Sequence, residues 1–403
     1  MRVKLGIART TTVLTSLCLS VALASGTAAP TRAQSADLPI GSAREGASSD
    51  GIDAATRGST DTLPDGSSIS AGSSNAYDSS LAPQTYPPAN PQAEATAPLS
   101  LGTDTGVDYG TSPTLLATRH VAGNSYEIDV WSPANHAVIT NLLLLPEGGL
   151  DNTSPRPTFY LLSGADGGAN GKNWRDSSDY EGFFAGKNVQ VVTPIGGGGS
   201  MNLNWLADDP TLGRNQWETY ICEELPQIMD TQFHGTGRDA IAGLSMSGGP
   251  SIHMAGDHPE RFHAAASLSG FPANSGQLGR LFTSDLIESK GGDPANALGD
   301  QANPAWLSMD PVANLDKLRG LRLFVGTGAG LPTLRDLTGD WYGFMWLEIL
   351  SQVFSNYFTR QAQAAGLDVN RYYTVFGAHN YTNFEREMRV AWEETIGPAL
   401  GLA

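Results

Sequence analysis

Residues 240–249 read AIAGLSMSGG, and this short stretch decides the fold. Its first five residues form an apolar run as long as a buried strand, and the glycine- and serine-rich residues after it lead into a helix. A serine between small residues at such a junction predicts a nucleophile elbow, a strained turn that raises the serine hydroxyl above the edge of the sheet. Gly243 and Ser247 are the small neighbours here. We predict that Ser245 is the nucleophile and that the backbone N–H of Met246 is an oxyanion donor; the alternative is an ordinary turn before a helix.

Apolar segments of strand length alternate with helical segments on both sides of this turn. Strands of this kind form a mostly parallel sheet that is covered by helices on both faces. The sequence therefore predicts an α/β fold of the α/β-hydrolase type. The predicted strands are residues 126–131, 138–145, 158–162, 189–194, 240–244, 264–268, 321–325 and 372–376, and the predicted helices are 217–230, 344–365 and one that begins near 383.

One histidine stands where this fold places its general base. A serine hydroxyl needs such a base, and the base follows the last strand of the sheet. His379 comes directly after the strand predicted at 372–376 and a Gly-Ala turn, so we predict that it is the base. A structural role is expected for the remaining histidines, which are His120, His136, His234, His253, His258 and His263.

The acid that orients the histidine is expected between Ser245 and His379 in the chain. Asp336, Asp340 and Glu348 all lie in the region that follows the strand at 321–325. Position alone does not choose among these three carboxylates.

Two glycine-containing stretches are candidate binding loops. Residues 163–165 follow the strand at 158–162, where the second oxyanion donor is usually found. Residues 196–200 lack the Lys-Ser/Thr pair of a phosphate-binding loop and are expected to form a mobile loop beside the active site. The histidines are scattered and thiols are scarce, so the sequence predicts neither a bound metal nor another cofactor.

The charge and the N-terminus indicate an exported protein. The 403 residues carry a formal net charge of −17, which argues against nucleic acid and against an anionic membrane surface as partners. A basic start, an apolar run at 11–24 and small residues after it predict a signal peptide over residues 1–33. This run is too short to span a membrane, so no membrane anchor is expected. Loss of the signal peptide would remove Cys18 and leave Cys222 as the only thiol, without an internal disulfide.

The region between the signal peptide and the first predicted strand has low complexity. Residues 34–112 are rich in Ser, Ala, Gly, Pro, Thr and Asp, and their few large apolar side chains follow no period. Such a segment does not bury enough surface to offset its ordering entropy. We expect a disordered linker here, either a spacer through a cell envelope or a solvated tail, and a single catalytic domain over residues 113–403.

Several fragments of the chain occur in the order known from one enzyme family. Residues 243–246 read GLSM, and WETY at 217–220 is followed by ELP at 224–226. From about residue 125 onward the sequence thereby resembles the secreted mycolyltransferases of the antigen-85 family, part of the wider esterase-D-like group. Further matching fragments are HP at 258–259, SLS at 267–269, PAW at 304–306 and DP at 310–311, together with Trp174 and Trp205.

The resemblance implies a role for each catalytic position. It makes Ser245 the nucleophile, His379 the base and Glu348 the acid, since Glu348 ends a Trp-Leu-Glu stretch that looks like the family's F-L-E. Ala165 and Met246 would supply the oxyanion N–H groups. The implied reaction moves a mycolyl chain from trehalose monomycolate to a sugar hydroxyl of a second such molecule or of cell-wall arabinogalactan. The implied partners are a glycolipid substrate and a sugar acceptor, and we expect a monomer of the cell envelope.

One stretch departs from the family pattern. The family's strand ends L-D-G-L-R, and its Asp and Arg hold trehalose, whereas residues 162–166 here read LSGAD. Ser163 and Asp166 therefore replace the sugar-binding pair, and the charge at the second position is reversed. We expect Ser163, Asp166, Trp174 and Trp205 to line the substrate site, with weaker recognition of trehalose.

Two other functions remain open from the sequence. A secreted carboxylesterase of the same fold would need only an open pocket and water as the acceptor. A catalytically silent envelope binding protein would keep the fold without the activity. The order of Ser245, Glu348 and His379 in the chain favours an enzyme over the silent protein.

Overall fold

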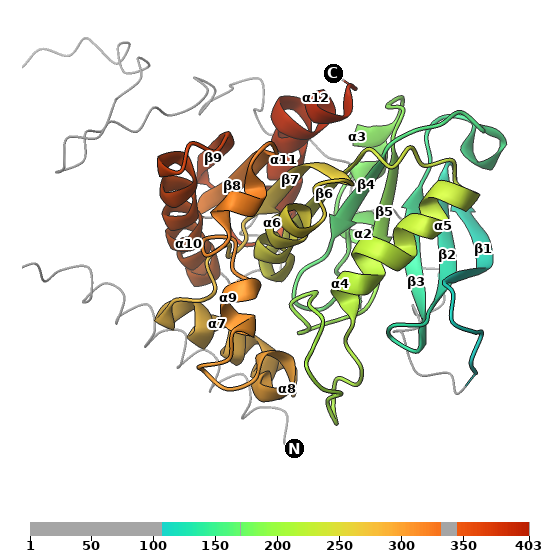
Figure 1. The fold of residues 1–403 in the computed structure, drawn as a ribbon. Coiled ribbons are helices and arrows are strands. Elements are labelled where there is room, and N and C mark those ends of the chain that lie inside the picture. The colour runs from blue at the N-terminus through green and yellow to red at the C-terminus, as the bar shows by residue number, and fades with distance from the viewer. Residues whose placement is uncertain (1–106, 170, 332–344, 403) are drawn as a thin grey trace, which may run out of the picture. The chain divides into compact units, whose positions relative to one another are not determined.

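The computed structural model describes residues 107–169, 171–331 and 345–402, and these residues are organised around one sheet (Figure 1). The sheet has nine strands in the order β1-β2-β3-β5-β4-β6-β7-β8-β9. The predicted signal peptide, most of the predicted linker, Asp336 and Asp340 lie outside the described residues. The strands are β1 Thr114–Ala122, β2 Ser125–Ser132, β3 Ala137–Leu144, β4 Thr158–Leu162, β5 Gln190–Pro194, β6 Asp239–Leu244, β7 Phe262–Leu268, β8 Arg322–Leu331 and β9 Val369–Phe376.

The sheet is mostly parallel, as the sequence predicts. β1, β2, β3 and β5 pair antiparallel in turn, whereas every pair from β5 through β4, β6, β7 and β8 to β9 is parallel. The sequence pattern did not predict β1. This strand forms one edge of the sheet, and much of it is exposed, so its composition lacks the apolar run of a buried strand.

Helices cover both faces of the sheet. One face packs on α4, α5, α6 and α10 through residues such as Leu225, Ile252 and Phe358, and the other packs on α2, α3, α11 and α12 through Phe184 and Phe384. The helices are α2 Trp174–Ser177, α3 Tyr180–Phe184, α4 Trp217–Thr219, α5 Leu225–Gln232, α6 Gly248–Asp257, α7 Gln277–Ser289, α8 Pro294–Leu298, α9 Ala305–Ser308, α10 Met345–Ala364, α11 Tyr381–Ala391 and α12 Gly397–Leu400. In the described residues, no helix is long and apolar enough to span a bilayer.

The helix predicted at 217–230 is not one regular helix. It consists of α4, a π-helical turn over Tyr220–Glu224, and α5. Pro226 stands at the start of α5 and has no N–H to donate to the carbonyl of Cys222 one turn earlier. The wider turn before the proline accommodates this missing bond.

The parallel strands bring the predicted site to one edge of the sheet. β4, β6, β7 and β8 are consecutive neighbours, so their carboxyl ends lie side by side. Ser163 follows β4, Ser245 follows β6, and Ser269 follows β7. His379 follows β9 two residues before α11 begins. Residues far apart in sequence therefore meet where α/β enzymes usually bind their ligands.

Candidate active site

Ser245 stands on a strained turn between β6 and α6. Its φ angle is +53°, in the left-handed region that non-glycine residues rarely adopt. A Cβ atom on Gly243 would lie 2.3 Å from the carbonyl oxygen of Ser247, and one on Gly248 would lie 2.6 Å from the Cα of Gly270. Small residues are therefore required around the serine, and the strand–turn–helix geometry is the one that residues 240–249 predict.

Three side chains from different parts of the chain form a hydrogen-bonded relay. The Nε2 atom of His379 lies 2.8 Å from Oγ of Ser245, and its Nδ1 atom lies 2.8 Å from Oε2 of Glu348. Ser245 is half-buried, His379 is nearly buried and Glu348 is fully buried. This is the arrangement in which a carboxylate orients an imidazole that removes a proton from a serine hydroxyl.

The surroundings of Glu348 suit a carboxylate anion. Its Oε1 atom accepts hydrogen bonds from Oγ of Ser269 at 2.8 Å and from the N–H of Gly328 at 2.5 Å. Glu348 lies in the first turn of α10. The structure thus places Glu348, of the three acids that the sequence left open, within bonding distance of His379; the catalytic role of each of these residues stays a prediction.

Aromatic rings and a helix start hold His379 in place. Phe384 meets the imidazole edge-on, with ring centroids 4.9 Å apart, and Phe271 lies on another side at 6.1 Å. Asn380 caps α11 by accepting the N–H of Asn383 at 3.2 Å. The imidazole is consequently positioned by packing as well as by its two hydrogen bonds.

The loop after β4 lies against the elbow. A Cβ atom on Gly164 would come within 3.4 Å of the Cβ of Ser245. The glycine-rich stretch at 196–200 supports this loop, because the N–H of Gly199 donates to the carbonyl of Ala165 at 3.1 Å. Ala165 and Met246 therefore flank the serine, where oxyanion donors would be needed, and their role stays a prediction.

The two positions that depart from the family pattern differ in their surroundings. Ser163 is buried, with only 5% of its surface exposed. Asp166 forms ion pairs with Lys172, at 3.0 Å, and with Lys290. Burial alone would raise the pKa of Asp166, but the hydrogen bonds from Lys290 and Lys172 outweigh it and lower the pKa. The reversed charge is thus balanced by two lysines of this chain.

The two tryptophans predicted to line the substrate site are both buried. Trp174 is fully buried, and its indole N–H donates to the carbonyl of Leu162 at 3.2 Å. Trp205 is 3% exposed, and its indole N–H donates to the carbonyl of Ser200 at 2.9 Å. Both support the loops around the site, and direct contact of either ring with a substrate stays a prediction.

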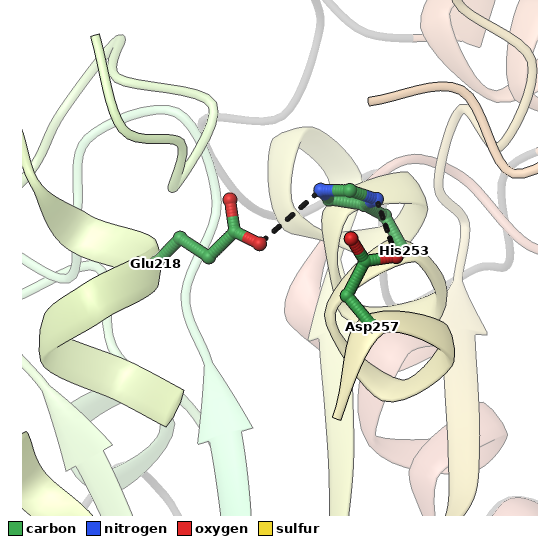
Figure 2. A group of neighbouring side chains, drawn as sticks. All are labelled: Glu218, His253 and Asp257. Atoms are coloured by element: carbon green, nitrogen blue, oxygen red, sulfur yellow. Dashed lines mark ion pairs between the residues drawn. The ribbon is translucent and has the colours of Figure 1, made fainter. Parts of the chain in front are cut away.

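One histidine outside the relay lies between two carboxylates (Figure 2). Nε2 of His253 is 3.4 Å from Glu218, whereas Nδ1 is 3.8 Å from Asp257. Asp257 also pairs with Nζ of Lys317 at 2.8 Å. A metal ion binds a single ring nitrogen of a histidine, and here the carboxylates approach different nitrogens while a lysine already neutralises one of them. One ligand atom from each of these three residues lies within 4.8 Å of the others, and Asp257 is in addition paired with Lys317, so the cluster is a compact group of polar side chains apart from the relay.

The sequence pattern missed three polar residues behind the relay. Ser269 contacts both Glu348 and Glu387, and Asn383 bonds to Glu387 at 2.8 Å. Ser269 belongs to the SLS fragment and has a φ angle of +46°, but neither feature is visible as a function in one sequence. In the sequence, Glu387 looks like an ordinary helix residue. Its contact with Ser269 depends on the packing of α11 on the sheet.

Comparison with known proteins agrees with this geometry. A family model described as "Putative esterase" matches residues 132–394, which is more than half of the chain. The chain belongs to this esterase family. The predicted α/β-hydrolase fold is confirmed, since the esterase-family chain superposes on the crystal structure of Mycobacterium tuberculosis MPT51 (FbpC1) with a TM-score of 0.57 at 21% identity, covering 70% of this chain and 99% of that one.

Curated relatives confirm the resemblance to antigen-85 proteins. This chain is 32% identical over 216 residues to the diacylglycerol acyltransferase/mycolyltransferase Ag85C of Mycobacterium avium, and the match covers 51% of this chain and 60% of that relative. It is 29% identical over 248 residues to Ag85A of Mycobacterium ulcerans, covering 59% of this chain and 69% of that relative. The match to Ag85C thus spans less than two thirds of its length, and this chain is a divergent antigen-85-like member.

Proposed function

We propose that this chain is a secreted acyltransferase that carries a long-chain, mycolyl-type acyl group on Ser245 and transfers it to a sugar hydroxyl. The observation that carries the proposal is the relay from Glu348 through His379 to Ser245, with 2.8 Å at each step. His379 would take the serine proton during attack on the donor ester. It would then give this proton to the leaving sugar oxygen and activate the acceptor hydroxyl in the second half of the reaction.

The elbow and the loop after β4 support the oxyanion part of the proposal. The backbone N–H groups of Met246 and Ala165 belong to the two segments that flank Ser245. Fixed N–H donors at such positions stabilise the tetrahedral intermediate, commonly by several kcal/mol (about 2.7 to 4 for one donor). This contribution does not depend on the side chains at 163 and 166, so acylation of Ser245 is expected despite the altered sugar-binding pair.

The apolar environment beside the relay supports a long-chain acyl group. Phe271, Phe282, Leu350 and Phe354 form a buried cluster of α7, α10 and the loop after β7, and Phe271 of this cluster lies next to His379. These side chains are buried against one another, so an acyl chain would contact them by lying along the edge of the cluster next to His379, which we propose as the apolar side of the acyl site. The relatives named as diacylglycerol acyltransferase/mycolyltransferase support the same substrate class.

Hydrolysis is the second candidate function, and one observation favours it. Asp166, with its two lysines, occupies the position where the resemblance calls for a trehalose-binding arginine. If no sugar binds well there, water becomes the acceptor and the protein acts as a carboxylesterase.

The chain would reach its substrate by export. We propose, on the sequence alone, that residues 1–33 are the signal peptide and that residues 34–112 are the linker.

Transfer and hydrolysis are distinguished in one experiment. The protein is incubated with trehalose monomycolate, with or without an added sugar acceptor, and mass spectrometry quantifies trehalose dimycolate, other acylated sugars and free mycolic acid. The proposal predicts acylated sugar products that require Ser245. Free acid alone would support the carboxylesterase, and no turnover of this or of simple esters would support the silent binding protein.

A further inference from the structure

A second buried carboxyl group lies beside the acid of the relay. Glu387 of α11 is fully buried. Oγ of Ser269 is 2.8 Å from Oε1 of Glu348 and 3.0 and 3.2 Å from the two oxygens of Glu387. A Cβ atom on Gly326 would lie 2.9 Å from Cγ of Glu387, so the side chain fits against β8 only because this residue is glycine.

The hydrogen atoms available to this pair do not satisfy two carboxylate anions. Ser269 has one hydroxyl proton for three nearby carboxylate oxygens. The Nδ2 atom of Asn383 donates to Glu387 at 2.8 Å and lies 3.4 Å from Glu348. With both carboxyl groups ionised, Oγ of Ser269 would donate to one of them and present a lone pair to the other, which is repulsive.

A proton on Glu387 resolves this conflict. The protonated carboxyl donates to Oγ of Ser269, and Ser269 then donates its own proton to Oε1 of Glu348. Glu348 also accepts from the N–H of Gly328, and its Oε2 atom faces His379. Ser269 and Gly328 then both donate to Glu348, while Asn383 donates to Glu387 and to Oγ of Ser269, at 2.8 and 3.1 Å. This pattern leaves no two lone pairs facing each other when the anion is on Glu348 and the proton on Glu387.

The charges around the pair lead to the same assignment. The titratable groups that face Glu387 are Glu348 from α10 and Arg371 and Tyr372 from β9. Burial lowers the pKa of Arg371 to about 10, so Arg371 stays a cation at neutral pH, and among the described residues it is the cation with an electrostatic effect on Glu387. One cation balances one carboxylate. Burial, followed by the charge of Glu348, raises the pKa of Glu387 well above its ordinary value of 4.5.

We propose that Glu387 carries a proton at neutral pH and acts, through Ser269, as a positioning residue that keeps Glu348 ionised and aimed at His379. The inference deepens the proposed function and rests on the relay described there. A neutral donor behind Glu348 fixes the orientation of the anion without adding a second negative charge beside it. Ionisation of Glu387 at alkaline pH would remove that donor and leave two buried anions in contact.

Two substitutions at one position separate this role from a structural one. Glutamine has the shape of the protonated acid, and its amide can donate to Ser269 and accept from Asn383, whereas methionine fills the space without either bond. Glu387→Gln should lower kcat for a short-chain nitrophenyl ester by less than about threefold, and Glu387→Met by about tenfold to a hundredfold, the size of a lost hydrogen bond to an anion. Glu393→Gln, an exposed change nearby in the chain, is the matched control and should leave kcat unchanged.

The pH profile gives a readout that packing alone would not change. Wild-type kcat should fall at alkaline pH as Glu387 loses its proton, and Glu387→Gln should keep its activity to higher pH because the amide does not ionise. The alternative is that Glu387 is ionised and balances the charge of Arg371. In that case Glu387→Gln would lower kcat as much as Glu387→Met at every pH, and the proposal would be wrong.

Infrared spectroscopy tests the proton directly and does not depend on activity. The wild-type protein at pH 7 should show the carbonyl band of a buried protonated carboxyl group, sensitive to deuterium exchange and missing in Glu387→Gln. Ser245→Ala should keep this band. Absence of the band from the wild-type protein would overturn the inference about Glu387, even if turnover still required Ser245. Turnover by Ser245→Ala would overturn the proposed function, even if the band were present.

Discussion

Nε2 of His379 lies 2.8 Å from Oγ of Ser245, although the two residues are 134 positions apart in the sequence. Two turns produce this contact. The elbow after β6 presents the serine at a φ angle of +53°, and the short turn after β9 places the histidine just before the start of α11. Because β6, β7, β8 and β9 are consecutive parallel neighbours, both turns open at the same edge of the sheet.

Removal of the charge on Glu348 should damage catalysis without unfolding the protein. Glu348→Gln keeps the side-chain shape but no longer stabilises the imidazolium that forms when His379 takes the serine proton. We expect kcat to fall by about 10² to 10⁴, as in other triads that lose their acid. The measurement is kcat for a nitrophenyl ester, with Asp336→Asn and Asp340→Asn as comparison variants. If either aspartate variant proves more damaging, Glu348 is not the acid.

A methyl group at the elbow should be poorly tolerated. In Gly243→Ala the new Cβ would meet the carbonyl oxygen of Ser247 at 2.3 Å, so the turn must move. We expect a loss of about 1 to 3 kcal/mol in the free energy of unfolding, the usual cost of overpacking, together with a marked loss of kcat. Urea denaturation measures the first quantity. Gly276→Ala is the control, because a Cβ atom at this position would meet nothing within 4 Å and the φ angle of Gly276 is −70°. Equal effects of the two variants on stability and on kcat would argue against a strained elbow.

Acceptor choice should depend on the charges around Asp166. Replacing Ser163 and Asp166 by the aspartate and arginine of the family would place a third cation beside Lys172 and Lys290. We expect this double variant to gain little transfer to trehalose, and a triple variant that adds Lys290→Met to gain more, measured as the ratio of acylated trehalose to free acid. Efficient trehalose use by the wild-type protein would show that other residues hold the sugar.

The stability of the protein should respond to pH through Glu387. Its folded-state pKa is raised, so its contribution to stability is complete below the ordinary value of 4.5 and is lost as the pH rises through the raised value. Glutamine at this position does not titrate. The Tm of Glu387→Gln relative to the wild type should therefore increase as the pH rises above 4.5. A difference that stays constant, or decreases, would mean that Glu387 is ionised in the folded protein.

The sequence predicts the parts of the site that depend on local pattern and chain order. Ser245 is recognisable from its strand–turn–helix context, and His379 from its place after the last strand. Glu348 could be chosen only by resemblance to the family, because the sequence of a long helix does not show which residue an acid on it contacts. The bounds of most predicted strands agree with the structure to within a few residues, since buried strands are short apolar runs.

The rest of the site depends on packing between elements. Glu387 meets Glu348 only because α11 lies on the sheet at Gly326, where no side chain intervenes. The edge strand β1 lacks an apolar run, and the break in the helix at 220–224 depends on a single proline. Trp174 is buried with its indole N–H bonded to the carbonyl of Leu162 at the end of β4, a contact between two elements that the local sequence around Trp174 does not predict.

The central claim is that Ser245 carries the acyl group, and the most direct measurement is mass spectrometry of the protein after brief incubation with an acyl donor. The account predicts an ester adduct, or a phosphonate adduct with an organophosphonate ester, on the peptide that contains Ser245. Ser245→Ala should show no adduct and should lose about 10⁴ to 10⁶ in turnover, as for removal of a nucleophile elsewhere. A folded Ser245→Ala protein with turnover within tenfold of the wild type, or an adduct on a different serine, would contradict it.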